Sequence, residues 1–440
     1  MKLKKARVLL MVGTVALVGA GVMAWNPSEG YQKATASTDY RQLDKFAQIM
    51  DAVKRTYVKD KTDEELIDGA LSGMLSSLDP HSTYMNKTMY KQMQVQTTGE
   101  FGGLGIEISS AEGGIRIISP IEDTPADHAG ILAGDLIVKI GEQLAKDISL
   151  PEAVKLMRGK PGSSLTLTIF RKTASEPLEI VIVRDVIHIK SVKSGVLEHG
   201  YVWLRVTQFQ EQSSKELKEQ IALLKKESGG TFKGAVLDLR NNPGGLLDQA
   251  VEISDMFLDT GGIVSTKSRV GKNMDFKANK GDVLDDAPLV VLINNGSASA
   301  SEIVSGALQD NQRAVLMGVR SFGKGSVQRI IPLPDGTAFK LTTALYYTPS
   351  GRSIQATGIE PDIEVPWVTL KTEKKKKGLH IFERDLKGHL ANGNGKKDSV
   401  AKKNNTASKE KIMTDRLSKD VQLERALDVL KAMHVVQQRG

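Results

Sequence analysis

Apolar residues recur at helical spacing in two stretches near the start of the chain. The first stretch runs from Leu43 to Val53 and the second from Leu66 to Leu75, and this spacing places them on one face of each helix. The second helix is expected to end before Pro80, because a residue that precedes proline avoids helical backbone angles. The sequence therefore predicts a helical segment over 39–97, whose apolar faces pack against each other, a neighbouring domain or a second chain.

After this segment, the pattern changes to short apolar runs that alternate with polar residues and are separated by glycines. Such alternation is typical of strands with one buried face. The segment 98–185 is therefore expected to be a β-rich insert. Its predicted elements are strands at 106–108, 115–118 and 164–169 and a helix at 150–157.

The next segment, 186–366, alternates strands with helices. Two runs, 235–239 and 289–293, are typical of strands buried on both faces, because they are apolar except for Asp238, and each is followed by glycine and then by a helix. This order predicts an α/β core built in layers. The remaining tail, 367–440, is poor in apolar residues until an amphipathic helix predicted at 417–436.

The N-terminus has the pattern of a secretory signal. Four basic residues within the first seven precede a mainly apolar, uncharged run over 8–24. The run is close to the lower limit of about 17 residues for a spanning helix, so it serves either as a cleaved signal, residues 1–24, or as a membrane anchor with its positive end inside. Both alternatives predict an exported protein, periplasmic or otherwise extracytoplasmic. The chain has no cysteine, which excludes disulfides and thiol catalysis.

The net charge of +8 is confined to one segment. Residues 371–411 contain 13 Lys and Arg against 5 Asp and Glu, so the rest of the chain is neutral overall. This distribution argues against nucleic acid as a partner. A run of like charges is usually a solvated tail, and binding to an anionic membrane surface or an acidic partner is the alternative.

Three short glycine-containing pieces stand out in the β-rich insert. They are Gly103-Leu104-Gly105-Ile106, Pro125-Ala126 with Ala129-Gly130, and Gly134-Asp135-Leu136-Ile137. In this order they resemble a PDZ domain. The resemblance implies that backbone N–H groups of Gly103, Leu104, Gly105 and Ile106 bind a peptide C-terminal carboxylate, and that the following strand offers its edge to the peptide.

Three further junctions follow predicted strands of the core, where ligands bind in open α/β sheets. They are 238–245, 294–302 and 322–328. Each also has a purely structural interpretation. The first, with Asn-Pro-Gly-Gly, reads as a turn, the second as a helix cap, and the third as an exposed loop lysine.

Taken together, the three junctions resemble the C-terminal processing peptidases, or tail-specific proteases, whose core is similar to that of crotonases and ClpP. The resemblance covers 39–366, with a helical segment, a PDZ domain and a catalytic core in that order. It implies that Ser299 is the nucleophile, Lys324 the base and Gln328 the residue that positions the lysine. It also implies an oxyanion hole made by the N–H of Ala300 and one N–H from Gly244 or Gly245.

This chemistry makes definite demands on the residues. A serine hydroxyl becomes a good nucleophile only when a nearby base accepts its proton. Lysine can act as that base only as a free amine, so its pKa must fall from about 10.4 towards roughly 7–8 through burial. A neutral amide such as that of Gln328 orients the amine without favouring its charged form. The expected enzyme is a serine endopeptidase that uses neither a metal nor another cofactor.

Other functions fit the sequence less well. A Ser–His–Asp triad is disfavoured because none of the seven histidines lies at a strand-to-helix junction. A PDZ scaffold with an idle or latent core remains open, and an acyl-thioester enzyme would need no peptide-binding domain. Expected partners are protein or peptide substrates with accessible C-termini, an activating adaptor protein and a second copy of the chain in a homo-oligomer.

Overall fold

The computed structural model describes residues 40–368, 417 and 419–439. The predicted signal or anchor over 1–24 and the basic run over 371–411 lie outside these residues. The chain divides into two compact units, one ending at Leu71 and the other beginning at Ser72. No helix in the described part combines the length and the apolar character that crossing a membrane requires.

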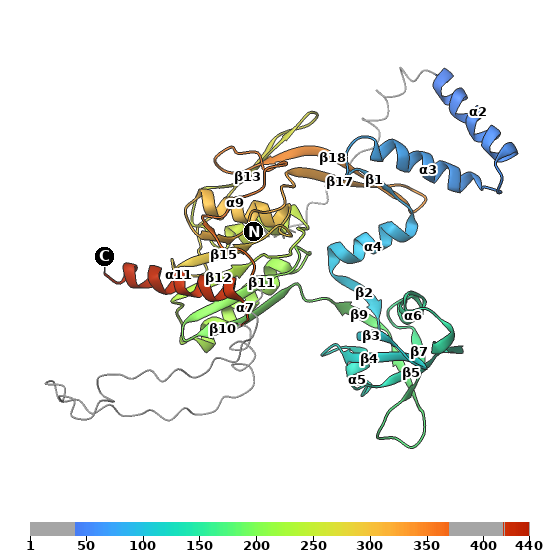
Figure 1. Cartoon of the computed structure of the whole chain (residues 1–440), viewed down its shortest axis with the longest axis horizontal. Coiled ribbons are helices and arrows are strands. Elements are labelled where there is room, and N and C mark those ends of the chain that lie inside the picture. Colours follow the sequence, from blue (N-terminus) through green and yellow to red (C-terminus); the bar gives the residue numbers. More distant parts are fainter. Residues whose placement is uncertain (1–39, 369–416, 418, 440) are drawn as a thin grey trace, which may run out of the picture. The chain divides into compact units, whose positions relative to one another are not determined.

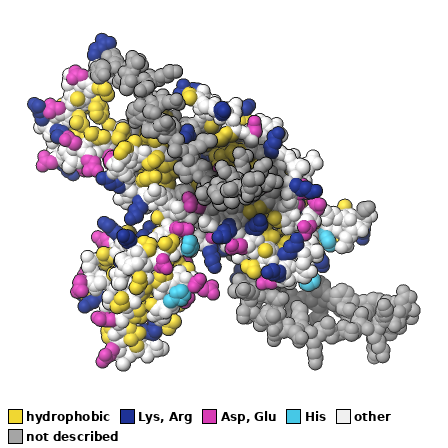
Figure 2. Space-filling model, turned by 180° about the vertical axis from the view of Figure 1, so that it is seen from behind, with side chains coloured by type: hydrophobic (Ala, Val, Ile, Leu, Met, Phe, Trp, Pro, Cys, Tyr) yellow, Lys and Arg dark blue, Asp and Glu magenta, His cyan; other side chains and the backbone are white. Residues whose placement is uncertain are grey.

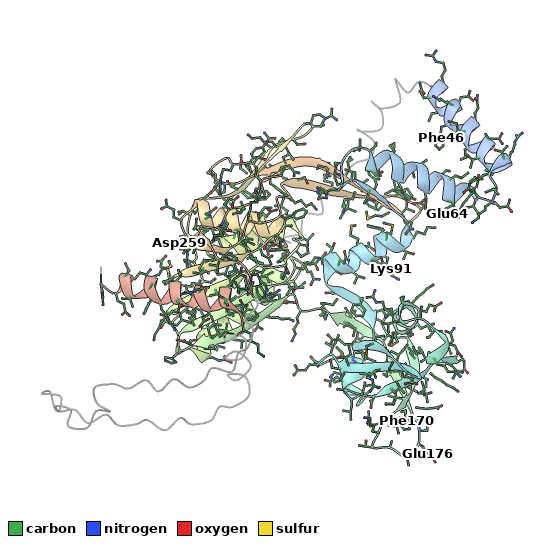
Figure 3. The ribbon with its side chains drawn as sticks, in the orientation of Figure 1. Phe46, Glu64, Lys91, Phe170, Glu176 and Asp259 are labelled. Carbon is green, nitrogen blue, oxygen red and sulfur yellow. The ribbon has the colours of Figure 1, made fainter. Side chains whose placement is uncertain are left out.

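A short strand at 83–85 interrupts the predicted N-terminal helical segment, which otherwise contains three helices. They are α2 (Tyr40–Thr56), α3 (Asp63–Ser76) and α4 (Lys87–Thr98). The apolar stripe of α2 is exposed at Leu43, Phe46 and Ile49. Hydrophobic side chains reach the surface in this part of the molecule (Figure 2), and Phe46 is carried by α2 (Figure 3). An exposed stripe of this kind still needs a partner surface.

The β-rich insert is built around a six-stranded antiparallel sheet. Its strands are β3 (Ile106–Ala111), β4 (Gly114–Pro120), β5 (Leu136–Ile140), β6 (Gln143–Leu144), β7 (Ser164–Phe170) and β8 (Leu178–Val183). Two helices accompany the sheet, α5 (Pro125–His128) and α6 (Leu150–Met157). A separate two-stranded pair joins β2 (Glu100–Gly103) to β9 (Asp185–His188). In the larger sheet β3 is an end strand, paired only with β4.

The core contains a second six-stranded sheet, in the order β10-β11-β12-β15-β16-β19. Its strands are β10 (Val192–Glu198), β11 (Tyr201–Val206), β12 (Gly234–Asp238), β15 (Leu289–Ile293), β16 (Val315–Gly318) and β19 (Ile363–Glu364). From β11 onward the neighbours are parallel. The ends of β12 and β15 therefore lie at the same edge, which brings the first two predicted junctions together.

Helices cover both faces of this sheet (Figure 1). They are α7 (Ser213–Glu227), α8 (Leu247–Asp255), α9 (Ala300–Asp310) and α11 (Val421–Gln437). Leu237 of β12 packs in the hydrophobic cluster of the first three helices, whereas its neighbour Val236 packs with α11. Burial on both faces explains why β15 is apolar throughout and why β12 is apolar up to Asp238, where it ends. The predicted α/β fold with a β-rich insert is confirmed.

A third sheet contains the strand that follows the predicted lysine. It consists of β1 (Thr83–Met85), β13 (Gly262–Ser268), β14 (Met274–Lys277), β17 (Ser326–Pro332) and β18 (Ala338–Tyr347). The central strand β18 pairs with β17 on one side and with β1 over part of the other. The short strand β1 thereby brings residues from before the PDZ segment to the core.

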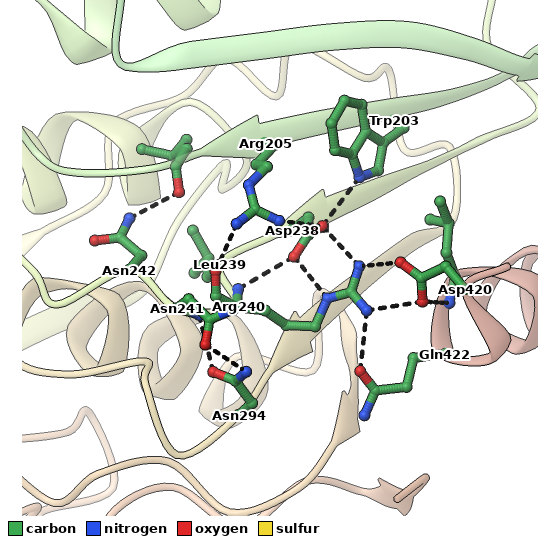
Figure 4. A network of polar contacts seen from close by, with 12 residues as sticks. Trp203, Arg205, Asp238, Leu239, Arg240, Asn241, Asn242, Asn294, Asp420 and Gln422 are labelled. Carbon is green, nitrogen blue, oxygen red and sulfur yellow. Dashed lines mark hydrogen bonds and ion pairs between the residues drawn. The ribbon is translucent and has the colours of Figure 1, made fainter. Parts of the chain in front are cut away.

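A buried network of charges ties α11 to the end of β12 (Figure 4). The guanidinium of Arg240 donates to both oxygens of Asp238 and, at 2.9 and 2.7 Å, to both oxygens of Asp420. Asp420 also caps α11 by accepting the N–H of Leu423. Buried charges are tolerated when they are paired in this way, so the network anchors the C-terminal helix beside the first junction.

Candidate active site

Ser299 differs from the serines on either side of it. The hydroxyls of Ser297 and Ser301 donate to the buried carbonyl oxygens of Leu239 and Asn242 at 2.8 and 2.9 Å. These two serines therefore hold the second junction against the first. Ser299 instead adopts a φ of 54°, which non-glycine residues rarely take, and stands directly before α9.

Glu302 organises the start of α9. Its side chain is fully buried, and its Oε2 accepts the N–H of Ser299 at 2.8 Å. In return, the N–H of Glu302 donates to the carbonyl oxygen of Ser299 at 2.9 Å. The helix-cap interpretation therefore holds for the Glu302 carboxylate, and it is compatible with a second role for the Ser299 hydroxyl.

The same carboxylate joins Ser299 to the third junction. Oε1 of Glu302 accepts the hydroxyl of Ser321 at 2.5 Å and the N–H of Gly323 at 2.6 Å, while Oε2 accepts the N–H of Lys324 at 2.8 Å. The backbone nitrogens of Ser299 and Lys324 thus share one acceptor oxygen, each at 2.8 Å. The two nitrogens therefore lie no further apart than twice this hydrogen-bond length. The structure brings the predicted nucleophile and base into one site.

Lys324 lies in an environment that favours its neutral form. Burial lowers the pKa of Lys324, and the positive charge of Lys340 lowers it further, while Glu302 and Asp79 oppose the shift. The flanking glycines are needed because a side chain at Gly325 would meet the backbone nitrogen of Gln355 at 2.4 Å. The predicted depression of the lysine pKa has a physical cause in this pocket.

Gln328 lies in β17, four residues after Lys324. Its Nε2 donates to the hydroxyls of Ser326 and Thr342 at 2.9 and 3.3 Å. Among the hydrogen bonds of the described residues, none joins Gln328 to Lys324. The contact through which Gln328 would orient the lysine is therefore not made in this structure.

The first junction approaches Ser299 closely. A Cβ at Gly244 would lie 2.9 Å from Cβ of Ser299 and 3.1 Å from the nitrogen of Ala300, and one at Gly245 would lie 2.0 Å from the carbonyl oxygen of Phe209. Neither position can hold a side chain. The N–H of Gly244 donates to Oδ1 of Asn242 at 2.9 Å, so this N–H is already used within the turn.

Sequence reasoning missed the turn that precedes β1. The carboxylate of Asp79 accepts the hydroxyl of Thr342 at 3.1 Å and the backbone N–H of His81 at 2.8 Å. His81 also lies close enough to Lys324 for charge coupling. Burial and the charge of Lys324 lower the pKa of His81, and Asp79 opposes them. The only sequence signal was the Asp79-Pro80 helix stop, which says nothing about distant neighbours.

In the PDZ segment, the predicted carboxylate-binding loop connects β2 to β3. The side chain of Leu104 is buried, and the carbonyl oxygens of Leu104 and Gly105 accept the N–H groups of Ala126 and Ile121. Gly105 has a φ of 80°, which suits glycine. The loop is thus held from its carbonyl side, and Ile106 begins the end strand β3.

Comparison with known proteins agrees with this architecture. Family models match over 200–365 for peptidase family S41, over 102–182 for a PDZ domain, and over 20–89 for the N-terminal domain of the activating protease CtpB. A carboxy-terminal-processing protease of Bartonella bacilliformis is 48% identical over 394 residues, which cover 89% of each chain. The carboxy-terminal processing protease CtpA of Bacillus subtilis is 36% identical, covering 82% of this chain and 77% of that protein.

Among solved structures, a photosystem II D1 C-terminal processing protease matches with 27% identity and a TM-score of 0.44. The match covers 75% of this chain and 94% of that one. The extent and identity of the Bartonella match establish the family. The chain is therefore a serine peptidase of family S41 with a PDZ domain, and it belongs to the carboxy-terminal-processing proteases.

Proposed function

We propose that this protein is an exported endopeptidase that binds protein C-termini in its PDZ domain, over 98–185, and hydrolyses peptide bonds in the core, over 186–366, with Ser299 and Lys324. The observation that carries the proposal is the shared Glu302 oxygen, which accepts the N–H groups of both residues. Burying the carboxylate of Glu302, which bonds to two junctions distant in the sequence, costs desolvation free energy. It is best explained by the need to hold a nucleophile beside its base.

In the proposed reaction, neutral Lys324 takes the proton of the Ser299 hydroxyl as the serine oxygen attacks the peptide carbonyl carbon. The resulting ammonium then gives this proton to the departing amine, which leaves an acyl-enzyme. Lys324 next deprotonates water, which attacks the ester, and the proton returns to Ser299 as the new carboxyl terminus leaves. Burial lowers the pKa of Lys324, which supports this double use, because each attack requires the neutral amine.

The oxyanion of the tetrahedral intermediate needs free N–H groups, each worth about 3–4 kcal/mol. Because the N–H of Gly244 is bonded to Asn242, we assign the glycine donor to Gly245. The second donor is the N–H of Ala300, the first residue of α9. The positive end of that helix adds to the stabilisation.

Substrate capture is assigned to the loop of Gly103, Leu104, Gly105 and Ile106. Its carbonyl groups at Leu104 and Gly105 are bonded inward, which supports a role for its N–H groups in binding a terminal carboxylate. The free edge of β3 supports addition of the peptide as a further strand. The basic and apolar N-terminus supports export, and the exposed stripe of α2 supports a homo-oligomer or an adaptor protein as its partner.

A latent form of the same protease is the second candidate. The observation that favours it is the amide of Gln328, which donates to Ser326 and Thr342, while no hydrogen bond within the described part of the chain joins it to Lys324. Activity that appears only after addition of a tail peptide or a partner would indicate this latent form. Constant activity of the isolated protein would exclude it.

The decisive experiment measures degradation of an unstructured polypeptide. Ser299→Ala should abolish cleavage while the protein stays folded. Ser228→Ala is a matched control, since the buried hydroxyl of Ser228 has no hydrogen-bond partner, and this variant should keep full activity. Undiminished cleavage by Ser299→Ala would remove the proposal.

A further inference from the structure

We propose that Asp79 is a positioning residue for the catalytic pair. Acting through Thr342, it fixes which end of the Gln328 amide is free to face Lys324. This inference rests on the proposed roles of Ser299 and Lys324. It adds a residue from the turn before β1, outside both the PDZ segment and the catalytic core.

The turn is held against the core by strand pairing and by a compact set of hydrogen bonds. Thr83 of β1 lies opposite Lys340 of β18, which places Asp79 beside Thr342, 263 positions later in the chain. The hydroxyl of Ser82 donates to Oδ2 of Asp79 at 2.7 Å and accepts the N–H of Thr342 at 3.1 Å. Asp79 thus has a defined place next to β18.

The direction of each hydrogen bond follows from the chemistry of the groups. An ionised carboxylate can only accept, so the Thr342 hydroxyl must donate its single proton to Asp79. The oxygen of Thr342 is then left as an acceptor, and Nε2 of Gln328 donates to it at 3.3 Å. The other amide hydrogen of Gln328 goes to Ser326 at 2.9 Å.

Both amide hydrogens of Gln328 are therefore donated, to Ser326 and Thr342. The carbonyl oxygen of the amide remains available to accept a hydrogen bond. That oxygen can accept an N–H from Lys324, whether the lysine is an amine or the ammonium formed during attack. If the amide were reversed, its NH₂ group would face Lys324 and repel the ammonium form of that lysine. The carboxylate of Asp79 decides between these two arrangements.

The charge state that this relay needs is supported by its surroundings. Burial alone would raise the pKa of Asp79, but hydrogen bonds from Ser82, His81 and Thr342 hold the pKa below its ordinary value. Asp79 therefore stays ionised at neutral pH. The charged and titratable groups that act on Lys324 are Lys340, Glu302, Asp79 and His81.

The test compares two substitutions that break the relay at different atoms. Asp79→Asn can donate to Thr342 and so removes the directionality, whereas Thr342→Val removes the hydroxyl and leaves the charge of Asp79. Each should lower kcat about tenfold, the size of one lost hydrogen bond, with little change in KM. Thr342→Ser should restore most of the activity lost in Thr342→Val. Thr343→Val serves as the matched control, since the Thr343 hydroxyl makes no hydrogen bond among the described residues, whereas that of Thr342 bonds to Asp79.

Two further measurements separate positioning from a structural role and from simple charge. In a Gln328→Ala background, Asp79→Asn should cause no additional loss of kcat, because its effect passes through the amide. Asp79→Asn should move the acid limb of the kcat/KM profile to lower pH, since Asp79 raises the pKa of Lys324, whereas Thr342→Val should leave the limb in place. If the loss of kcat from Asp79→Asn added in full to the loss from Gln328→Ala, while Ser299→Ala remained inactive, this inference would be overturned and the proposed function would stand. An active Ser299→Ala variant would overturn the proposed function instead.

Discussion

At the scale of single residues, the site depends on conformations that local preference disfavours. Ser299 takes a φ of 54°, and such strain, of about 1–3 kcal/mol, persists only where the surroundings over-determine the backbone. Here the surroundings are identified. Glu302 accepts the N–H of Ser299, and the flanking hydroxyls of Ser297 and Ser301 bond to buried carbonyls.

The charge of Lys340 should set the pH range of activity. It lowers the pKa of Lys324, so Lys340→Gln should raise that pKa and reduce the neutral fraction of the lysine at any given pH. The acid limb of kcat/KM is therefore expected to move to higher pH. Arg329→Gln is a matched loss of one positive charge on the neighbouring strand, at a residue that is not among the groups acting on Lys324. An equal shift in both variants would contradict a specific role for Lys340.

Replacement of the Glu302 carboxylate should weaken both stability and activity. In Glu302→Gln one oxygen becomes an NH₂ group. If this replaces Oε2, the N–H groups of Ser299 and Lys324 lose their acceptor, and if it replaces Oε1, the N–H of Gly323 does. We expect a loss of about 1–3 kcal/mol in the free energy of unfolding, measured by denaturant titration. Activity per folded molecule should also fall, because the two junctions lose their common anchor. Glu360→Gln, at an exposed carboxylate, should change neither quantity.

At the scale of elements, the C-terminal helix and the first junction form one unit. Arg240 contacts Asp238 at the end of β12 and Asp420 at the start of α11, while the next residue, Asn241, exchanges hydrogen bonds with Asn294 of the second junction. The helix is therefore coupled to the loops that carry Gly245 and Ser299. Its apolar face is buried as well, at Leu423, Leu427 and Leu430.

Removal of the Asp420 carboxylate should destabilise this unit. Asp420→Ala leaves the buried Arg240 with fewer partners and removes the cap of α11, so the free energy of unfolding should fall by about 2–4 kcal/mol. Asp428→Ala on the exposed side of the same helix should cost far less. Equal stability of the two variants would show that the network does not anchor the helix.

At the scale of the whole molecule, the proposed substrate capture and hydrolysis are assigned to different parts of one chain. The PDZ segment has its own hydrophobic cluster, separate from the clusters of the core. Such a division predicts that capture affects the apparent affinity for a substrate more than the chemical step. It also allows tail binding to shift the balance between a latent and an active form.

Amidation of a substrate's C-terminus should reveal this division. A long unstructured polypeptide with a free carboxylate should be cleaved with a kcat/KM about tenfold higher than its amidated form, because a charge-assisted contact with the loop is lost. A short peptide that spans only the core site should show no difference. Equal cleavage of both long forms would exclude capture through the terminal carboxylate.

The sequence predicted individual elements well where the signal is short-range. Helix α6 has the bounds expected for it, and β15 coincides with its apolar run. The roles proposed for Ser299 and Lys324 also came from local motifs, through family resemblance. Two missing parts of the site, the Asp79 turn and Glu302 as an anchor, depend on contacts with Thr342 and Lys324, which are distant in the sequence.

By itself, the sequence determined the class of the fold, the order of its segments and the family motifs, because periodicity and turn chemistry act over a few neighbouring residues. Only the tertiary structure decided that one carboxylate joins Ser299 to Lys324 and that the Asp79 turn lies beside β18. These contacts depend on strand pairing and on burial, which bring together residues that no local pattern relates.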